Sequence, residues 1–154
     1  MINLIFLFLL TAPAHVEYRQ LTWEDFKGAA VFGNSRSAET ITALEMTSDN
    51  VNGLYTFAVE CYFIPEESWT ITKDEKKLQH EQLHFAITRL YQQKIIQALI
   101  PFQGTSKVKE AEAIYKKITR QWKNTEIRYD KETFHSLDIS AQKNWESMIQ
   151  KQLR

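Results

Sequence analysis

The stretch that decides the fold runs from Thr72 to Leu99 and reads TKDEKKLQHEQLHFAITRLYQQKIIQAL. Its apolar residues recur mostly at intervals of three or four, the period of an α-helix with one buried face. They are Leu78, Leu83, Ile87, Leu90, Tyr91, Ile95 and Ala98. "TKDE" has the form of a capping box, with Thr72 as the N-cap and Glu75 bonding back to it. Because Pro101 cannot continue a helix, the sequence predicts one long helix over residues 73–99.

The same helix carries the pattern HEQLH at residues 80–84. His80 and His84 are four residues apart, so their side chains share one face about one turn apart. Two imidazoles placed in this way can occupy neighbouring corners of a zinc tetrahedron. Glu81 is offset by about 100° around the helix, and from there it can reach a water at the open position of the metal. In this H-E-x-x-H arrangement zinc lowers the pKa of the water and the glutamate is the general base.

The helical context strengthens this motif. Three fixed positions match by chance on the order of once in a few hundred chains of this length. Ile87 and Tyr91 continue the stripe of the two histidines, so the imidazoles should face the interior or a cleft. The alternative is a pair of core histidines hydrogen-bonded to backbone. Two such rings on one turn would both become charged in acid with nothing to share a proton, so the sequence favours a metal site, with Zn²⁺ as the ion.

A catalytic zinc needs a third protein ligand. The compact form HExxHxxGxxH is absent, because Ile87 stands where its glycine would be. We expect His135 to be this ligand, since it lies in "YDKETFHS" (129–136), a predicted loop with little core pattern. Asp130 and Asp138 lie close by and are the alternatives. Weaker candidates are two glutamates of the following predicted helix, Glu110 and Glu112.

Two neighbours of these ligands have possible supporting roles. The phenol of Tyr129 could donate a hydrogen bond to a tetrahedral oxyanion, although a packed aromatic with a wet hydroxyl is the more economical interpretation. Asp130, where it is not itself a ligand, could orient a ligating histidine. The catalytic prediction is therefore Glu81 with Tyr129 in support.

The remaining patterns predict an α+β fold. A β-hairpin is expected from two strands, 38–48 and 54–64, around the turn signal DNVNG (49–53). Further helices are expected over 107–122 and 137–154, with 124–136 irregular between them. The last helix should bury four apolar residues, namely Ile139, Trp145, Met148 and Ile149. The predicted architecture is a small antiparallel sheet packed on the long helix, with two further C-terminal helices.

Length and charge exclude some classes of function. A chain of 154 residues suits one domain. Its 19 lysines and arginines balance its 19 aspartates and glutamates, so no overall field favours nucleic acid. The single cysteine, Cys61, cannot close an internal disulfide.

The first residues have the pattern of a secretory signal peptide. They read MINLIFLFLLTAPAH, an uncharged run followed by small residues at Ala12 and Ala14. The run is too short to span a bilayer, which takes about 20 residues. We expect residues 1–14 to be cleaved after Ala14, leaving a single domain over 15–154 that is secreted or periplasmic and has no membrane span.

Five motifs resemble those of a known family. In chain order they are "LTWEDFKG" (21–28), "ESW" (67–69), "LQHEQLHF" (78–85), "YDKETFHS" (129–136) and "AQKNWESMI" (141–149). Together they resemble a family of small bacterial secreted proteins catalogued as a domain of unknown function and described as predicted zinc-dependent proteases. The resemblance implies zinc at His80 and His84, Glu81 as the base, and a role for "YDKETFHS". Members of that family often have glycine where this chain has Ser136.

The sequence therefore predicts an exported zinc metallohydrolase, foremost a peptidase acting on a peptide or protein substrate. One alternative is a binding module with a non-catalytic zinc, which a fourth protein ligand near His135 would favour. The other is a metallohydrolase with a non-peptide substrate, because the helix motif does not name what is cut.

Overall fold

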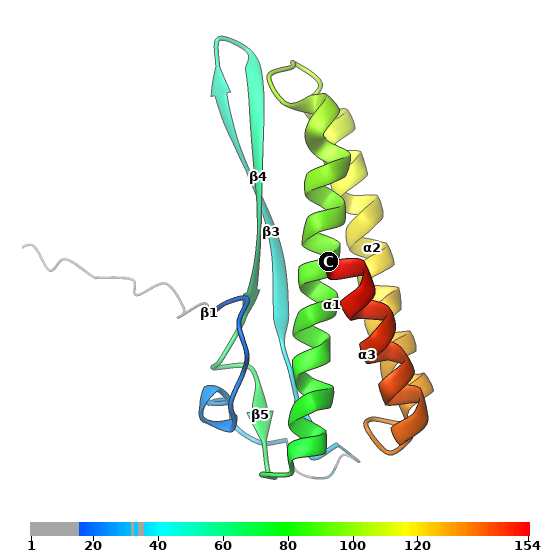
Figure 1. Ribbon diagram of the computed structural model, residues 1–154. Coiled ribbons are helices and arrows are strands. Elements are labelled where there is room, and N and C mark those ends of the chain that lie inside the picture. Colours follow the sequence, from blue (N-terminus) through cyan, green and yellow to red (C-terminus); the bar gives the residue numbers. More distant parts are fainter. Residues whose placement is uncertain (1–15, 32, 34–35) are drawn as a thin grey trace, which may run out of the picture.

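The computed structural model describes residues 16–31, 33 and 36–154. The predicted signal peptide, residues 1–14, lies outside the described residues. Three helices accompany small antiparallel sheets, so the α+β prediction is confirmed (Figure 1). None of the helices in the described part of the chain is long and apolar enough to cross a membrane.

The predicted β-hairpin is confirmed with shifted bounds. β3 (Thr42–Val51) pairs antiparallel with β4 (Leu54–Phe63) along the full length of both strands. The turn consists of Asn52 and Gly53, with φ of 54° and 83°. Positive φ at both positions is typical of a two-residue type I′ turn, whose twist matches the twist of the strands. The strand therefore continues to Val51, through most of the segment that we expected to be a turn.

Two short strands complete the sheets. β1 (Val16–Glu17) pairs with β4, which gives the order β1-β4-β3. β2 (Ala38–Glu39) pairs instead with β5 (Trp69–Thr70) in a separate two-stranded sheet. Residues 38–39, predicted as part of the hairpin strand, therefore belong to another sheet. Between β2 and β3, the hydroxyl of Ser68 accepts a hydrogen bond from the backbone N–H of Ile41 at 2.9 Å.

The long predicted helix is confirmed as α1 (Glu75–Leu99), but its predicted N-cap is wrong. The cap is Asp74, whose Oδ1 accepts from the backbone N–H of Lys77 at 2.9 Å. The hydroxyl of Thr72 instead accepts from the backbone N–H of Asp74, one step earlier. Asp ranks above Thr as an N-cap, and the carboxylate of Asp74 accepts from one of the first-turn N–H groups that have no partner within the helix.

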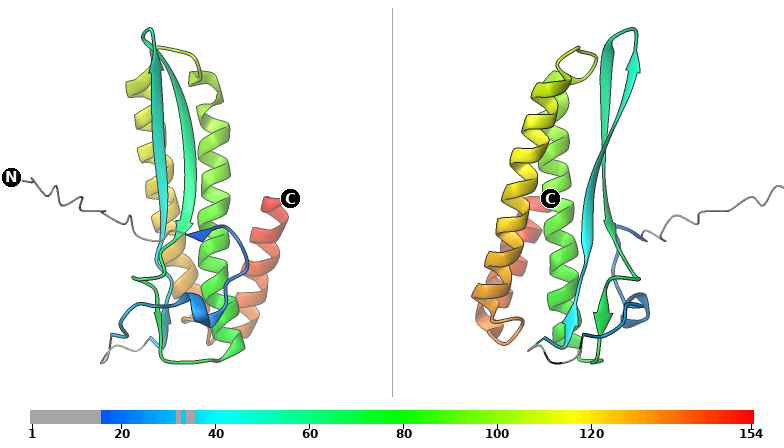
Figure 2. Two further views of the ribbon diagram at one scale, coloured as in Figure 1. Left: turned by 90° about the vertical axis from the view of Figure 1, so that its left-hand side faces the viewer. Right: turned by 180° about the vertical axis from the view of Figure 1, so that it is seen from behind.

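Helix α1 is the centre of the molecule. It contacts β3 and β4 on one side and α2 (Val108–Thr133) and α3 (Ile139–Leu153) on the other (Figures 1 and 2). The completely buried apolar side chains of the core include Phe63, Phe85, Ile87, Ile95 and Leu99. Burying each contributes roughly 1.5–3 kcal/mol. The core thus holds α1 on both sides, and with it the two histidines.

Helix α2 is longer than predicted, because it continues through residues 124–133, which we expected to be irregular. The inward side of this extension carries Glu126, Tyr129 and Thr133, at helical spacing from the buried Trp122. Two of these residues are polar, so the apolar period that announces a helix is interrupted. The helix ends at Phe134, whose backbone has φ of 48°.

Helix α3 confirms the predicted terminal helix, but the set of residues that it buries differs from the prediction. Trp145 and Ile149 are buried as expected, whereas Ile139 and Met148 are 51% and 38% exposed. The third inward position is taken by Gln142, which is 7% exposed. A buried amide needs hydrogen-bond partners, and those of Gln142 lie at the site described next.

Candidate functional site

His80, Glu81 and His84 line a cleft of about 600 Å³. The cleft lies between α1, the extended residues 36–42, helix α2 and the loop that joins α2 to α3. Asp130 and His135 line the same cleft. The structure therefore brings the predicted helix motif together with His135, the expected third ligand, and with Asp130, one of its two alternatives.

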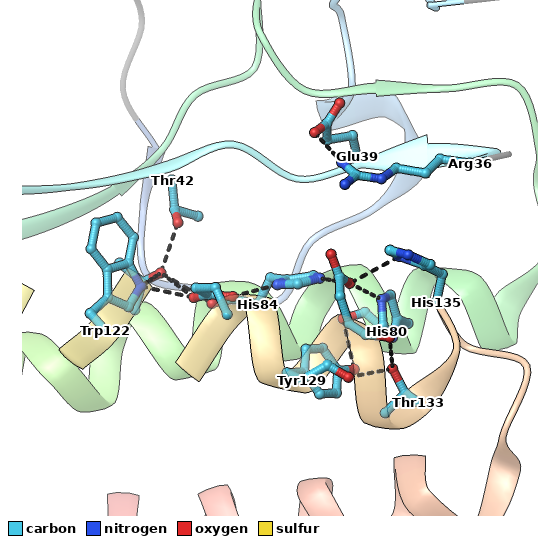
Figure 3. A network of polar contacts seen from close by, with 12 residues as sticks. Arg36, Glu39, Thr42, His80, His84, Trp122, Tyr129, Thr133 and His135 are labelled. Atoms are coloured by element: carbon cyan, nitrogen blue, oxygen red, sulfur yellow. Dashed lines mark hydrogen bonds and ion pairs between the residues drawn. The ribbon is translucent and has the colours of Figure 1, made fainter. Parts of the chain in front are cut away.

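Asp130 is the hub of this cluster. Its Oδ1 lies 3.1 Å from Nε2 of His80, 3.1 Å from Nε2 of His84 and 3.3 Å from Nδ1 of His135 (Figure 3). Burial alone would favour the neutral acid. The hydrogen bonds from His80 and His84, with the charges of His84 and His135, more than offset it and hold the pKa of the Asp130 carboxyl below its usual range. One ionised oxygen is thus surrounded by three imidazole nitrogens.

His84 is held from behind by Glu126. Its Nδ1 is hydrogen-bonded to Oε2 of Glu126, while Oε1 of the same carboxylate accepts from the indole N–H of Trp122 at 2.8 Å. Burial opposes protonation of His84, but the charge of Glu126 and the hydrogen bonds to both carboxylates raise the pKa of the imidazole well above its ordinary value. Thr88 contacts Glu126 and shares a hydrogen bond of 2.7 Å with Thr42, which links this support to β3 (Figure 3).

His80 is held in a similar way by a neutral group. Its Nδ1 lies 3.1 Å from Oε1 of Gln142 on α3. The same oxygen accepts from the hydroxyl of Tyr129 at 2.7 Å, and the amide N–H₂ of Gln142 donates to Glu146. The amide oxygen can only accept, so Nδ1 of His80 carries the proton and its Nε2 is directed to Asp130.

Both rings therefore lie between two acceptors. His80 lies between Gln142 and Asp130, and His84 between Glu126 and Asp130. A neutral imidazole has one N–H and cannot donate to both. Each ring then requires a second proton or a cation on the Nε2 side. A histidine that binds a metal usually donates its other ring N–H to a neighbouring acceptor, which fixes the tautomer and the orientation of the ring. Gln142 and Glu126 lie in this position at Nδ1 of His80 and of His84.

The donor set fits zinc. His80, Asp130 and His135 each offer a ligand atom, and these atoms all lie within 4.8 Å of one another. His84 lies outside this group and joins it through its contact with Asp130. Ligands about 2.0–2.1 Å from a tetrahedral zinc are about 3.3 Å from each other, close to the 3.1–3.3 Å between Asp130 Oδ1 and the three imidazole nitrogens. Imidazole and carboxylate are both ordinary zinc ligands.

Glu81 is 5% exposed, and its Oε2 has no hydrogen-bond partner among the described residues. Leaving a buried carboxylate oxygen unpaired is costly. Glu81 also lines the cleft, where its Oε2 is buried and has no hydrogen-bond partner among the described residues.

Other predicted residues lie elsewhere. Tyr129 is completely buried, stacks on His80 with ring centroids 4.6 Å apart and gives its hydroxyl to Gln142, so its place is in the packing behind His80. Burial raises the pKa of its phenol. Asp138 is the N-cap of α3, accepting from the backbone N–H of Ala141 at 2.9 Å. The weaker candidates lie on exposed positions of α2 outside the cleft; these are Glu110 and Glu112.

Sequence reasoning missed Glu126 and Gln142. A continuous helix through 124–133 would have placed Glu126 four residues after Trp122 and four before Asp130, on one face. That spacing is the signal that could have found Glu126. Gln142 has no comparable signal beyond its helical spacing to Trp145 and Ile149.

Comparison with known proteins gives one match. Residues 67–136 match a family described as "Bacterial protein of unknown function (DUF922)". The match includes "ESW", the helix motif and "YDKETFHS", whereas the motifs at 21–28 and 141–149 lie outside it. Searches of curated proteins and of solved structures found no significant match. The family description names neither a metal nor an activity. Over residues 67–136, the chain is similar to a bacterial family whose function is unknown.

Proposed function

We propose that this protein is a zinc-dependent metallohydrolase and, foremost, a peptidase. One observation carries the proposal: His80 and His84 each lie between two acceptors, with their Nε2 atoms toward Asp130, in a cleft that also holds the unpaired Glu81. This arrangement supports a cation at the cluster and a base beside it.

The residues that would hold zinc are His80, His84 and His135, with Asp130 as a further ligand or as the group that orients the three rings. When bound, zinc supplies Lewis-acid activation of water and of a substrate carbonyl. Gln142 and Glu126 keep the two rings of α1 in one tautomer and one orientation, so the ligand atoms are preorganised.

Glu81 is the proposed general base. It takes a proton from the attacking water and delivers it to the leaving amine. Because its Oε2 has no partner to give up among the described residues, no hydrogen bond has to break before it accepts that proton. The extended residues 36–42 form the opposite wall of the cleft, a shape that suits an extended peptide.

A second candidate function rests on the number of donors. His80, His84, Asp130 and His135 together could complete a four-coordinate site, which is typical of structural zinc. Such a protein would be a zinc-containing binding module. The unpaired, buried Glu81 favours the enzyme, because a structural site has no use for a base.

The test uses the domain over residues 15–154, supplied with zinc, beside Glu81→Gln. We expect about one zinc per chain in both, measured by mass spectrometry. We also expect hydrolysis of an unfolded protein substrate by the unaltered domain alone, with a loss of roughly 100-fold or more in the variant. Glu75→Gln is the matched control, because Glu75 is exposed in the first turn of the same helix.

The outcomes separate the candidates. Full activity in zinc-loaded Glu81→Gln contradicts the mechanism. Zinc in both proteins with no hydrolysis by either, and with four protein ligands in the X-ray absorption spectrum, favours the binding module. Hydrolysis of small esters but of no peptide favours a non-peptide substrate.

A further inference from the structure

Three large apolar side chains are exposed in the cleft itself. Ile127, Phe134 and Leu137 are 66%, 65% and 75% exposed, and all three line the cleft that holds His80 and Glu81. We call these three residues the apolar patch. Exposed apolar surface that gathers in one place is a mark of a binding site, whereas single exposed apolar residues are ordinary.

The patch is continuous with the candidate zinc ligands. Ile127 and Asp130 are three residues apart on α2, and Phe134 is the C-cap of the same helix, so all three residues lie at its C-terminal end. Phe134 directly precedes His135 in the chain. Whatever reaches Glu81 and the three imidazoles therefore has the apolar patch beside it.

The backbone at this point is strained. Phe134, His135 and Ser136 have φ of 48°, 50° and 77°. Residues with a side chain rarely adopt this left-handed region, and a bulky residue there is an outlier. Strain of this kind is kept where the surrounding structure has a use for it. Here the same strained turn brings His135 to Asp130 and leaves Phe134 at the cleft.

The opposite wall has a different character. Arg36 and Glu39 form an ion pair there (Figure 3), and Glu39 also accepts from the indole N–H of Trp69. The exposed apolar side chains of the patch thus lie on the side of α2, opposite an ion pair on the side of β2. A peptide lying in the cleft presents side chains alternately to the two sides.

We propose that the apolar patch is a specificity subsite, and that the substrates are peptide segments with a large apolar residue next to the bond that is cut. The inference rests on the proposed function, because the occupant of the subsite is the substrate of the neighbouring centre. An apolar side chain placed there covers the patch and leaves water, which is favourable. A charged side chain gains nothing there and loses hydration.

The test measures binding and cutting separately. The binding probe is a set of fluorescein-labelled heptapeptides with a Gly-Ser-Ala background, in which one position at a time carries Leu, Phe, Asn or Asp. Binding to zinc-supplied Glu81→Gln is followed by fluorescence anisotropy, and cutting by the unaltered domain is followed by mass spectrometry. At one position we expect Leu and Phe to bind about tenfold or more tightly than Asn or Asp.

The patch variants are Ile127→Ser and Phe134→Asn, each combined with Glu81→Gln. Asn accepts the left-handed conformation more readily than most residues, so Phe134→Asn should preserve the turn. Val51→Ser and Leu54→Ser are the matched controls, because they remove exposed apolar side chains, 68% and 52% exposed, at the turn of the β3–β4 hairpin. Circular dichroism checks that each variant is folded.

The subsite is supported when the apolar preference falls at least severalfold in both patch variants and stays unchanged in the controls. It is overturned when Leu and Asp peptides bind equally, or when the preference survives in the patch variants. Cutting without apolar preference overturns the subsite and leaves the peptidase standing. Apolar preference in binding, lost in the patch variants, without cutting by the unaltered domain, overturns the peptidase and leaves the apolar patch as a binding site for apolar side chains of peptides.

Discussion

The amide oxygen of Gln142 lies 3.1 Å from Nδ1 of His80, so α3 holds one of the two histidines of the helix motif. The glutamine is almost completely buried and also accepts the hydroxyl hydrogen bond of Tyr129. Its oxygen determines which nitrogen of His80 carries the proton, and so which nitrogen is available to a metal.

Replacing Gln142 should therefore weaken zinc binding without touching a ligand. Gln142→Leu removes the acceptor at Nδ1 of His80, and we expect zinc affinity to fall roughly 10- to 100-fold. Competition with a chromophoric chelator measures it. Gln150→Leu, an exposed position on the same helix, is the control and should bind zinc as the unaltered protein does. Equal affinity in all three proteins would show that His80 is oriented without the glutamine.

Glu126 should have a similar effect through His84. Glu126→Gln removes the carboxylate at Nδ1 of His84, and the new amide can turn an N–H toward that nitrogen. We expect zinc affinity to fall roughly 10- to 100-fold. Glu132→Gln is a close control, because both glutamates accept the N–H of an indole, that of Trp145 for Glu132 and that of Trp122 for Glu126. A similar loss in Glu132→Gln would mean that α2 is simply destabilised.

Zinc should stabilise the folded protein. A ligand that binds only the folded state at about a thousandfold its Kd adds about 4 kcal/mol to the free energy of unfolding. We expect the thermal midpoint to rise with zinc and to return with a chelator. His135→Ala and Asp130→Ala should each reduce this rise. Asp138→Ala should keep it while losing roughly 1 kcal/mol of its own, since Asp138 is an N-cap. A full rise in His135→Ala would remove His135 from the ligand set.

The backbone at position 136 should favour glycine over alanine. Ser136 has φ of 77°, which only glycine adopts without strain. Its hydroxyl accepts from the ammonium of Lys77 at 3.0 Å, so Ser136→Ala is the reference that loses this contact and keeps the strain. We expect Ser136→Gly to be more stable than Ser136→Ala by about 1 kcal/mol, measured by denaturant unfolding. Alanine as stable as glycine would show that the turn relaxes in solution.

The parts of the fold that a sequence can predict are those where apolar residues still dominate the pattern. Eight of the twelve buried residues of α1 are apolar, and the hairpin has a dense turn signal between β-branched strands. The end of α2 was missed because Glu126 and Asp130 serve the cleft, so the apolar period breaks there. The face of α3 that is buried was predicted only in part for the same reason, since one of its inward positions is occupied by the polar residue Gln142. Sequence patterns fail where a residue is chosen for chemistry over packing.

The sequence predicts the part of the candidate site on α1 more directly than the part at the end of α2. His80, Glu81 and His84 follow from spacing within one helix, which geometry alone fixes. His135 and Asp130 come from another segment, and only the path of α2 and its left-handed end brings them to α1. No local rule predicts that one oxygen of Asp130 would be shared by three rings.

The contact between α3 and His80 also bears on where this protein can be divided. The similarity to the bacterial family ends at residue 136, and a fragment cut there would still contain His80, His84, Asp130 and His135. It would lack Gln142 and the indole of Trp145, which packs against Tyr129 with ring centroids 5.3 Å apart. We expect such a fragment to hold His80 poorly, whether it is expressed alone or transplanted into another scaffold. Helix α3 carries no candidate ligand, yet its Gln142 orients the imidazole of His80.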